Sequence, residues 1–110
     1  MTRRILLCIV LLIQFLILGQ PAYSQFPRFK VLAFYSKQVE PDHVEFAFEA
    51  IDFFKGLTSG NGFVFDTTSN MNDLVSPGLK NYSVVMMLND FPHDKAQCDA
   101  FRNFQRCNSE

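Results

Sequence analysis

The sequence predicts an α/β fold, a three-layer doubly wound arrangement in which helices cover both faces of a parallel sheet. Between residues 29 and 107, segments with strand and helix patterns follow one another as strand, helix, strand, short helix, strand and helix. The first and third strand segments are apolar runs without alternation, which is typical of strands buried on both faces. Alternating strands and helices favour parallel pairing through right-handed crossovers. We expect an incomplete sheet of about three strands with two to three helices.

Three segments have the length and composition of buried strands, namely residues 29–35, 63–68 and 82–89. In a flavodoxin-like strand order, the first and third of these strands are neighbours in the sheet. The connection over residues 69–80 is expected to contain a single helical turn, because Pro77 and Gly78 disfavour a long helix.

Two longer helices are expected, and each begins with a capping pattern. Pro41 opens the first helix, where Asp42 is placed to cap the helix and Glu45 completes a capping-box-like pair. Asp94 and Gln97 repeat this pattern before the last helix. The residues of the last helix expected to point inward are Ala100, Phe101 and Phe104.

The first long helix carries a wide apolar arc beside one polar stripe. It is therefore expected to pack on the sheet and on a further neighbour. Its phenylalanines are expected to be core residues, with a ligand-binding aromatic box as the alternative interpretation; they are Phe46, Phe48, Phe53 and Phe54.

Residues 1–24 are expected to be a secretory signal peptide that is not part of the fold. Arg3 and Arg4 form a basic segment, residues 5–19 are almost wholly apolar, and residues 22–24 resemble a cleavage site. The alternative is an uncleaved membrane anchor, but the apolar run is shorter than the roughly 20 residues of a spanning helix. We therefore expect export to the periplasm or the extracellular space, without membrane attachment after cleavage.

Cleavage after residue 24 would leave one domain, residues 25–110, with a formal net charge of −3 instead of −1. No basic patch remains, which argues against nucleic acid as a partner. Cys98 and Cys107 would lie about 13 Å apart along one helix, at roughly 1.5 Å per residue. That exceeds the roughly 7 Å limit between disulfide-bonded Cα atoms, so a bridge would require the end of the helix to unfold.

Two loops are expected to border one crevice at the carboxyl ends of the strands, residues 36–43 and 89–94. His43, at a helix start, could contact a substrate oxygen or carboxylate, or could be a surface histidine beside a cap. Asp90 and His93 could act as orienting group and base, or could bind a divalent metal. No metal site is assigned, because an open zinc site needs three protein ligands.

The chain resembles the ThuA-like (trehalose-utilisation) family, whose fold is that of the class I glutamine amidotransferases. The matching stretches are residues 30–35, 41–47, 61–68 and, above all, 82–93, and the spacing of Gln97, Ala100 and Phe101 also fits. The greatest likeness is to exported members from Bacteroidetes-type bacteria.

The resemblance implies a link to the metabolism of oxidised or otherwise modified sugars. It implies catalytic roles for His43, Asp90 and His93, and it leaves the cofactor unknown. Asn89 could bind a sugar hydroxyl, or could close the third strand with a backbone hydrogen bond. A non-catalytic module that binds a carbohydrate or a protein is the alternative function.

Family members continue from the last helix into a glycine-rich turn and a strand that ends near a Gly-x-His element. The sequence stops at Glu110, before this element. We therefore expect a partial ThuA-like domain, from a truncated or frame-shifted gene or a cut fragment, with little activity alone. The third strand would then expose an apolar edge over residues 84–88, a pattern that favours self-association.

Overall fold

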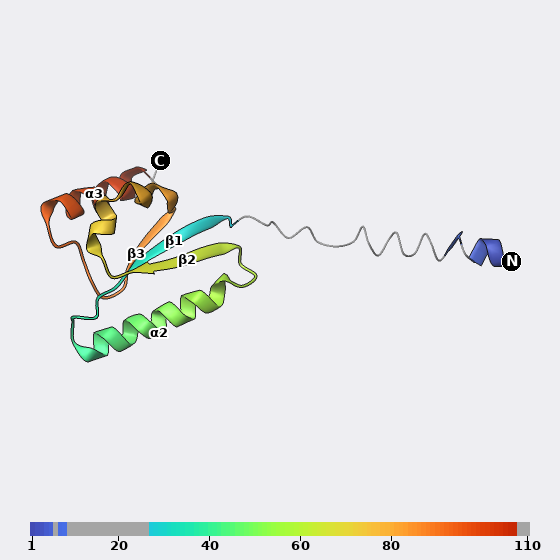
Figure 1. Ribbon diagram of the computed structural model, residues 1–110, viewed down its shortest axis with the longest axis horizontal. Coiled ribbons are helices and arrows are strands. Elements are labelled where there is room, and N and C mark those ends of the chain that lie inside the picture. The colour runs from blue at the N-terminus through green and yellow to red at the C-terminus, as the bar shows by residue number, and fades with distance from the viewer. Residues whose placement is uncertain (6, 9–26, 108–110) are drawn as a thin grey trace.

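The computed structural model describes residues 1–5, 7–8 and 27–107 (Figure 1). The predicted signal peptide falls mainly on residues 9–24, which lie outside the described residues, so it stays a prediction. Among the described residues, no helix has both the length and the apolar character needed to cross a membrane.

The described strands are β1 (Phe29–Phe34), β2 (Phe63–Thr68) and β3 (Val84–Met87), which form a parallel sheet in the order β2-β1-β3. The predicted α/β fold with a flavodoxin-like incomplete sheet is thus confirmed, including the pairing of the first and third strands. β3 is shorter than the predicted strand, because its partner β1 ends at Phe34. Beyond this point, only the Leu88 N–H still bonds to the Phe34 carbonyl, at 3.0 Å.

β1 is buried on both faces, as its continuous apolar sequence predicts. Leu32 and Phe34 belong to a cluster on one face of the sheet, whereas Val31 and Ala33 belong to a cluster on the other face. This alternation follows from the two-residue period of a strand. In Figure 1, α2 lies on one side of the sheet and α3 on the other, which gives the three layers.

The helix α2 (Pro41–Thr58) has Glu40 at its N-cap and no side-chain cap hydrogen bond. The prediction that Asp42 caps this helix with Glu45 as its partner is therefore wrong. Pro41 takes the first helical position, where its missing N–H leaves no bond unmade. Asp42 consequently lies inside the first turn, where its negative charge is favourable near the helix N-terminus.

Only Ala47 and Ile51 of α2 are buried. The expectation that all four phenylalanines of this helix are core residues is wrong for three of them: the exposed fractions are 56% for Phe46, 44% for Phe48 and 62% for Phe53. Phe54 packs on the sheet, stacked on Phe65 with ring centroids 5.3 Å apart, and the half-exposed Phe48 makes an edge contact with Tyr35 at 5.8 Å. The reason is geometric, since a helix lying on a narrow sheet buries one stripe of its surface.

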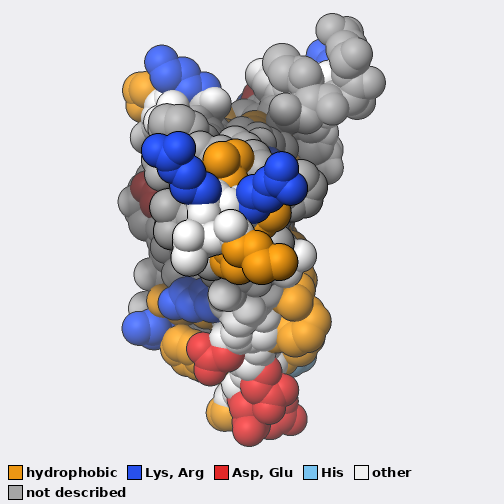
Figure 2. Space-filling view, turned by 90° about the vertical axis from the view of Figure 1, so that its right-hand side faces the viewer, with side chains coloured by type: hydrophobic (Ala, Val, Ile, Leu, Met, Phe, Trp, Pro, Cys, Tyr) orange, Lys and Arg blue, Asp and Glu red, His pale blue; other side chains and the backbone are white. Residues whose placement is uncertain are grey.

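The exposed phenylalanines give α2 an apolar outer surface. α2 lies at the bottom of the molecule in Figure 1. The lower part of Figure 2, which is turned about the vertical axis, shows hydrophobic side chains at the surface beside acidic ones. The further neighbour expected for this helix is absent from the described part of the chain.

The opposite face of the sheet is covered by two short 3₁₀ helices, η1 (Met71–Val75) and η2 (Pro77–Asn81), and by α3 (Lys95–Cys107). The connection predicted to hold one helical turn therefore holds two short helices. The 3₁₀ helices bury Met71, Leu74 and Leu79 against β1. The predicted inward residues of α3 also pack on this cluster: Ala100, Phe101 and Phe104.

The predicted cap of α3 is confirmed. The Asp94 carboxylate accepts a hydrogen bond from the Gln97 N–H at 2.8 Å. The Gln97 side chain is 5% exposed, accepts from the His93 N–H at 2.7 Å and donates to Asn72 Oδ1 at 3.0 Å. Gln97 thereby joins the loop after β3 to η1. Cys98, on the same helix as Cys107, is a free thiol.

Candidate functional site

The loops that follow β1 and β3 are joined by the side chain of Asn89. Its Oδ1 accepts a hydrogen bond from the Ser36 N–H at 2.7 Å. Its Nδ2 donates to the Ser36 carbonyl at 2.9 Å and to the His43 carbonyl at 3.1 Å. The predicted proximity of the two loops is therefore observed. Both hydrogens of the Asn89 side-chain amide are donated to backbone carbonyls. This favours a role for Asn89 in closing the third strand and its loop over a role in binding a sugar hydroxyl.

Replacing Asn89 with alanine is expected to lower the free energy of unfolding by about 1–3 kcal/mol, because partly buried backbone groups lose their partners. Urea unfolding followed by circular dichroism measures the change. Asn61→Ala is the matched control, since the Asn61 amide makes one exposed hydrogen bond, to the Leu57 carbonyl. Equal losses for both variants would show that Asn89 does not tie the loops together.

Asp90 and His93 form the hydrogen-bonded pair that the sequence suggests. His93 Nε2 lies 2.8 Å from Asp90 Oδ1, and the Asp90 side chain is 11% exposed whereas that of His93 is 56% exposed. Asp90 Oδ1 also accepts from the Phe91 N–H at 2.9 Å, which holds the carboxylate in place. In the tautomer that carries its proton on Nε2, His93 donates to Asp90 and keeps Nδ1 available as a base.

His43 contributes to this region through its backbone rather than its ring. The imidazole is 66% exposed, and its Nδ1 lies 3.8 Å from Glu40 Oε2. Within the described residues, no hydrogen bond or ion pair joins the His43 ring to Asp90 or His93. The same part of the chain contains no group of three or more His, Cys, Asp or Glu residues arranged to hold a metal ion.

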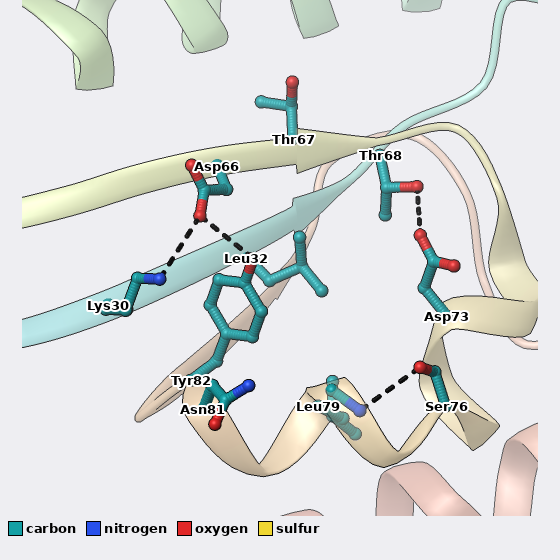
Figure 3. A pocket seen from close by; sticks show the side chains of 11 residues that line it. Lys30, Leu32, Asp66, Thr67, Thr68, Asp73, Ser76, Leu79, Asn81 and Tyr82 are labelled. Atoms are coloured by element: carbon teal, nitrogen blue, oxygen red, sulfur yellow. Dashed lines mark hydrogen bonds and ion pairs between the residues drawn. The ribbon is translucent and has the colours of Figure 1, made fainter.

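A polar cavity of about 330 Å³ lies between the sheet and the 3₁₀ helices η1 and η2 (Figure 3). On one side of this cavity, the Tyr82 hydroxyl donates to Asp66 Oδ2 at 2.9 Å. Lys30 Nζ lies 4.0 Å from the same carboxylate oxygen and 5.3 Å from the centre of the Tyr82 ring. No sequence motif indicates this cavity. The sequence feature that could have pointed to the cavity is Asp66, an acidic residue that directly follows three apolar positions of β2.

Tyr82 acts as a hydrogen-bond donor in this cavity. Partial burial raises the pKa of the Tyr82 phenol, and the hydrogen bond to Asp66 and the negative charges of Asp66 and Asp73 raise it further. Because the raised pKa lies above the ordinary value for tyrosine, the hydroxyl keeps its proton at neutral pH.

No protein-family model matches the chain, and no curated protein matches it. Among solved structures, the chain is similar to a protein from Bacteroides uniformis ATCC 8492 that is described as thua-like, with a TM-score of 0.67 and 45% sequence identity. The similarity covers 78% of this chain. It supports membership of the ThuA-like family.

The ThuA-like similarity agrees with the resemblance seen in the sequence. The 45% identity supports a trehalose-utilisation-related family. The chain spans 36% of the length of the Bacteroides protein.

Proposed function

We propose that this ThuA-like chain is part of an exported domain with the class I glutamine amidotransferase-like fold, and that the domain acts on oxidised or otherwise modified sugars. The proposal is carried by the Asp90–His93 pair, in which a carboxylate lies 2.8 Å from an imidazole. This pair follows β3, and in parallel sheets ligands bind beyond the carboxyl ends of the strands.

In this proposal, His93 is the general base and Asp90 orients its ring. His43, at the start of α2, contacts a substrate oxygen or carboxylate. Asn89 fixes the distance between the two loops through its three backbone hydrogen bonds. Within the described residues, the proposed site is bordered by the loops after β1 and β3, and we propose that this chain alone binds such a sugar weakly and has little activity.

The imidazole signals in NMR spectra test this placement, because the chain contains two histidines. His43→Gln and His93→Gln assign the two signals, and D-gluconate serves as the oxidised sugar. We expect D-gluconate to shift the His93 signal saturably. Asp90→Asn should weaken this binding about tenfold, since the imidazole loses a charge-assisted hydrogen bond.

Asp52→Asn is the matched control for Asp90→Asn, because Asp52 is an exposed carboxylate on α2. D-gluconate should shift the His93 signal in this control as in the unaltered chain. If both histidine signals stay unmoved, D-gluconate does not bind at the proposed site. If Asp90→Asn and Asp52→Asn bind D-gluconate equally well, Asp90 has no role in binding.

A non-catalytic carbohydrate-binding module is the second candidate, favoured by the exposed His43 ring, which lies beside Glu40 and makes no hydrogen bond to the Asp90–His93 pair. The longer Bacteroides uniformis protein distinguishes the two candidates. Chemical conversion of D-gluconate or a related oxidised sugar by that protein would favour the enzyme. Saturable binding of the same sugars without conversion would favour the module.

A further inference from the structure

The polar cavity between the sheet and η1/η2 is separate from the site proposed at the strand ends, which is called the crevice below. Its lining comes from β1, β2, the two 3₁₀ helices and Tyr82, and includes none of His43, Asn89, Asp90 or His93. Its volume, about 330 Å³, falls at the lower end of the range for small-molecule sites, which is about 300–1,000 Å³. The cavity can therefore hold a small ligand without any contribution from the crevice.

Two hydrogen-bonded pairs lie on different sides of the cavity. One is Tyr82 with Asp66, and the other is Thr68, whose hydroxyl donates to Asp73 Oδ2 at 2.5 Å. Figure 3 shows the Asp66 pair near Lys30 and the Asp73 pair near Ser76, with the Leu32 side chain between them. These contacts hold both carboxylates in place before any ligand arrives, which reduces the ordering that binding would require.

The remaining hydrogen-bonding capacity of the cavity is mainly that of an acceptor. An ionised carboxylate offers about four lone-pair positions. Asp66 accepts from Tyr82 and lies near Lys30, while Asp73 accepts from Thr68 and from Asn70 Nδ2 at 3.0 Å. Both carboxylates can therefore accept further hydrogen bonds from hydroxyl groups of a ligand.

The charges of the lining disfavour anionic ligands, because they comprise two carboxylates and one ammonium group. An anionic ligand would approach two carboxylates, Asp66 and Asp73, and a cationic ligand would compete with Lys30, which already lies 4.0 Å from Asp66. The buried side chains of Leu32 and Leu79 add apolar surface that suits a carbon–hydrogen face. Hydroxyl donors around an apolar face are the properties of a small neutral polyol.

We propose that this cavity binds a neutral polyhydroxylated ligand about the size of one monosaccharide. The proposal rests on the cavity alone and does not depend on the function proposed for the crevice. The backbone amide of Gly78 can detect ligand binding, because Gly78 lines the cavity. Gly56 serves as the reference, since it lies on α2 with open space around it.

The test is a titration of the full chain, labelled with ¹⁵N at its five glycines, with D-glucose, D-glucosamine and D-glucuronate in turn. We expect D-glucose to shift the Gly78 amide signal saturably while the Gly56 signal stays in place. D-glucosamine should bind more weakly, and D-glucuronate should leave the Gly78 signal unchanged. A response to D-glucosamine alone, or equal shifts of both glycines, would overturn the proposal.

Two substitutions place the ligand in the cavity. Asp66→Asn should weaken D-glucose binding about tenfold, through the loss of ligand hydrogen bonds to a charged group. Tyr82→Phe should weaken it by a similar factor, because it removes the hydroxyl that holds the Asp66 carboxylate in place. Their matched controls are Asp52→Asn on α2 and Tyr35→Phe, whose ring packs in the cluster on the opposite face of the sheet. Tyr82→Phe keeps the ring, so it serves as the test if Asp66→Asn does not fold. Unchanged binding in Tyr82→Phe would overturn the site.

The readouts of the two proposals are independent. The crevice is monitored through the His93 imidazole and the cavity through the Gly78 amide. A shift of one signal without the other therefore shows which of the two sites binds the added sugar.

Discussion

Replacing Phe34 with alanine is expected to lower the free energy of unfolding by about 3–5 kcal/mol. Phe34 is 0% exposed and ends β1, the central strand, where its side chain packs in the cluster beneath η1, η2 and α3. Alanine would remove the ring and leave a cavity that the surrounding side chains fill only in part. Because domains are typically stable by about 5–15 kcal/mol, this change should remove a large share of the protein's stability.

Phe53→Ala is the matched control, because it makes the same chemical change on the exposed side of α2, where the side chain is 62% exposed. Its expected effect is within about 0.5 kcal/mol. Urea unfolding followed by circular dichroism measures both variants. Similar losses of stability for Phe34→Ala and Phe53→Ala would mean that the packing of β1 differs from the structure described above.

We expect the chain to self-associate through β3, and Val84→Lys to suppress this association. Within the described residues, β3 pairs with β1 on one side, and its other edge has no partner strand. Its four residues carry no charge and Val84 is 39% exposed, so the edge can pair with another chain. The outer edge of β2 is also unpaired there, but polar Asp66, Thr67 and Thr68 make it a poorer template.

Size-exclusion chromatography with light scattering measures the association. The unaltered chain should elute as dimers or larger species whose proportion rises with concentration, whereas Val84→Lys should be mainly monomeric. Val75→Lys is the matched control, because Val75 is 51% exposed on η1, away from the strand edge. A monomeric unaltered chain, or equal suppression by both lysine substitutions, would contradict association through β3.

Much of the fold could be predicted because its signals are local. The limits of β2 agree with the predicted strand over residues 63–68, and those of β1 differ from the predicted strand by one residue. The cap of α3 at Asp94 was also visible, since it depends on residues three positions apart. The cap of α2 was predicted wrongly, because Pro41 at the first helical position moves the start of the helix ahead of Asp42.

The candidate site was predictable in part. Asp90 and His93 are three residues apart in one loop, so their pairing required little tertiary information. The hydrogen bonds from Asn89 to Ser36 and His43 join residues about 50 positions apart, and they depend on β3 lying beside β1.

The polar cavity could not be predicted at all. Lys30, Asp66, Asp73 and Tyr82 come from four separate elements or connections, and none of them belongs to a recognisable motif. Only the packing of η1 and η2 against the sheet brings their side chains together.

Apolar runs, turn residues and capping patterns therefore determine which segments become strands and helices, because each of these preferences acts over a few neighbouring residues. Tertiary packing decides which side chains of those segments are covered. It buries Phe34 and leaves Phe53 exposed, although both lie in apolar segments, and it converts scattered polar residues into a cavity. The physical reason is that burial and charge pairing depend on distances between segments, which the order of residues along the chain does not specify.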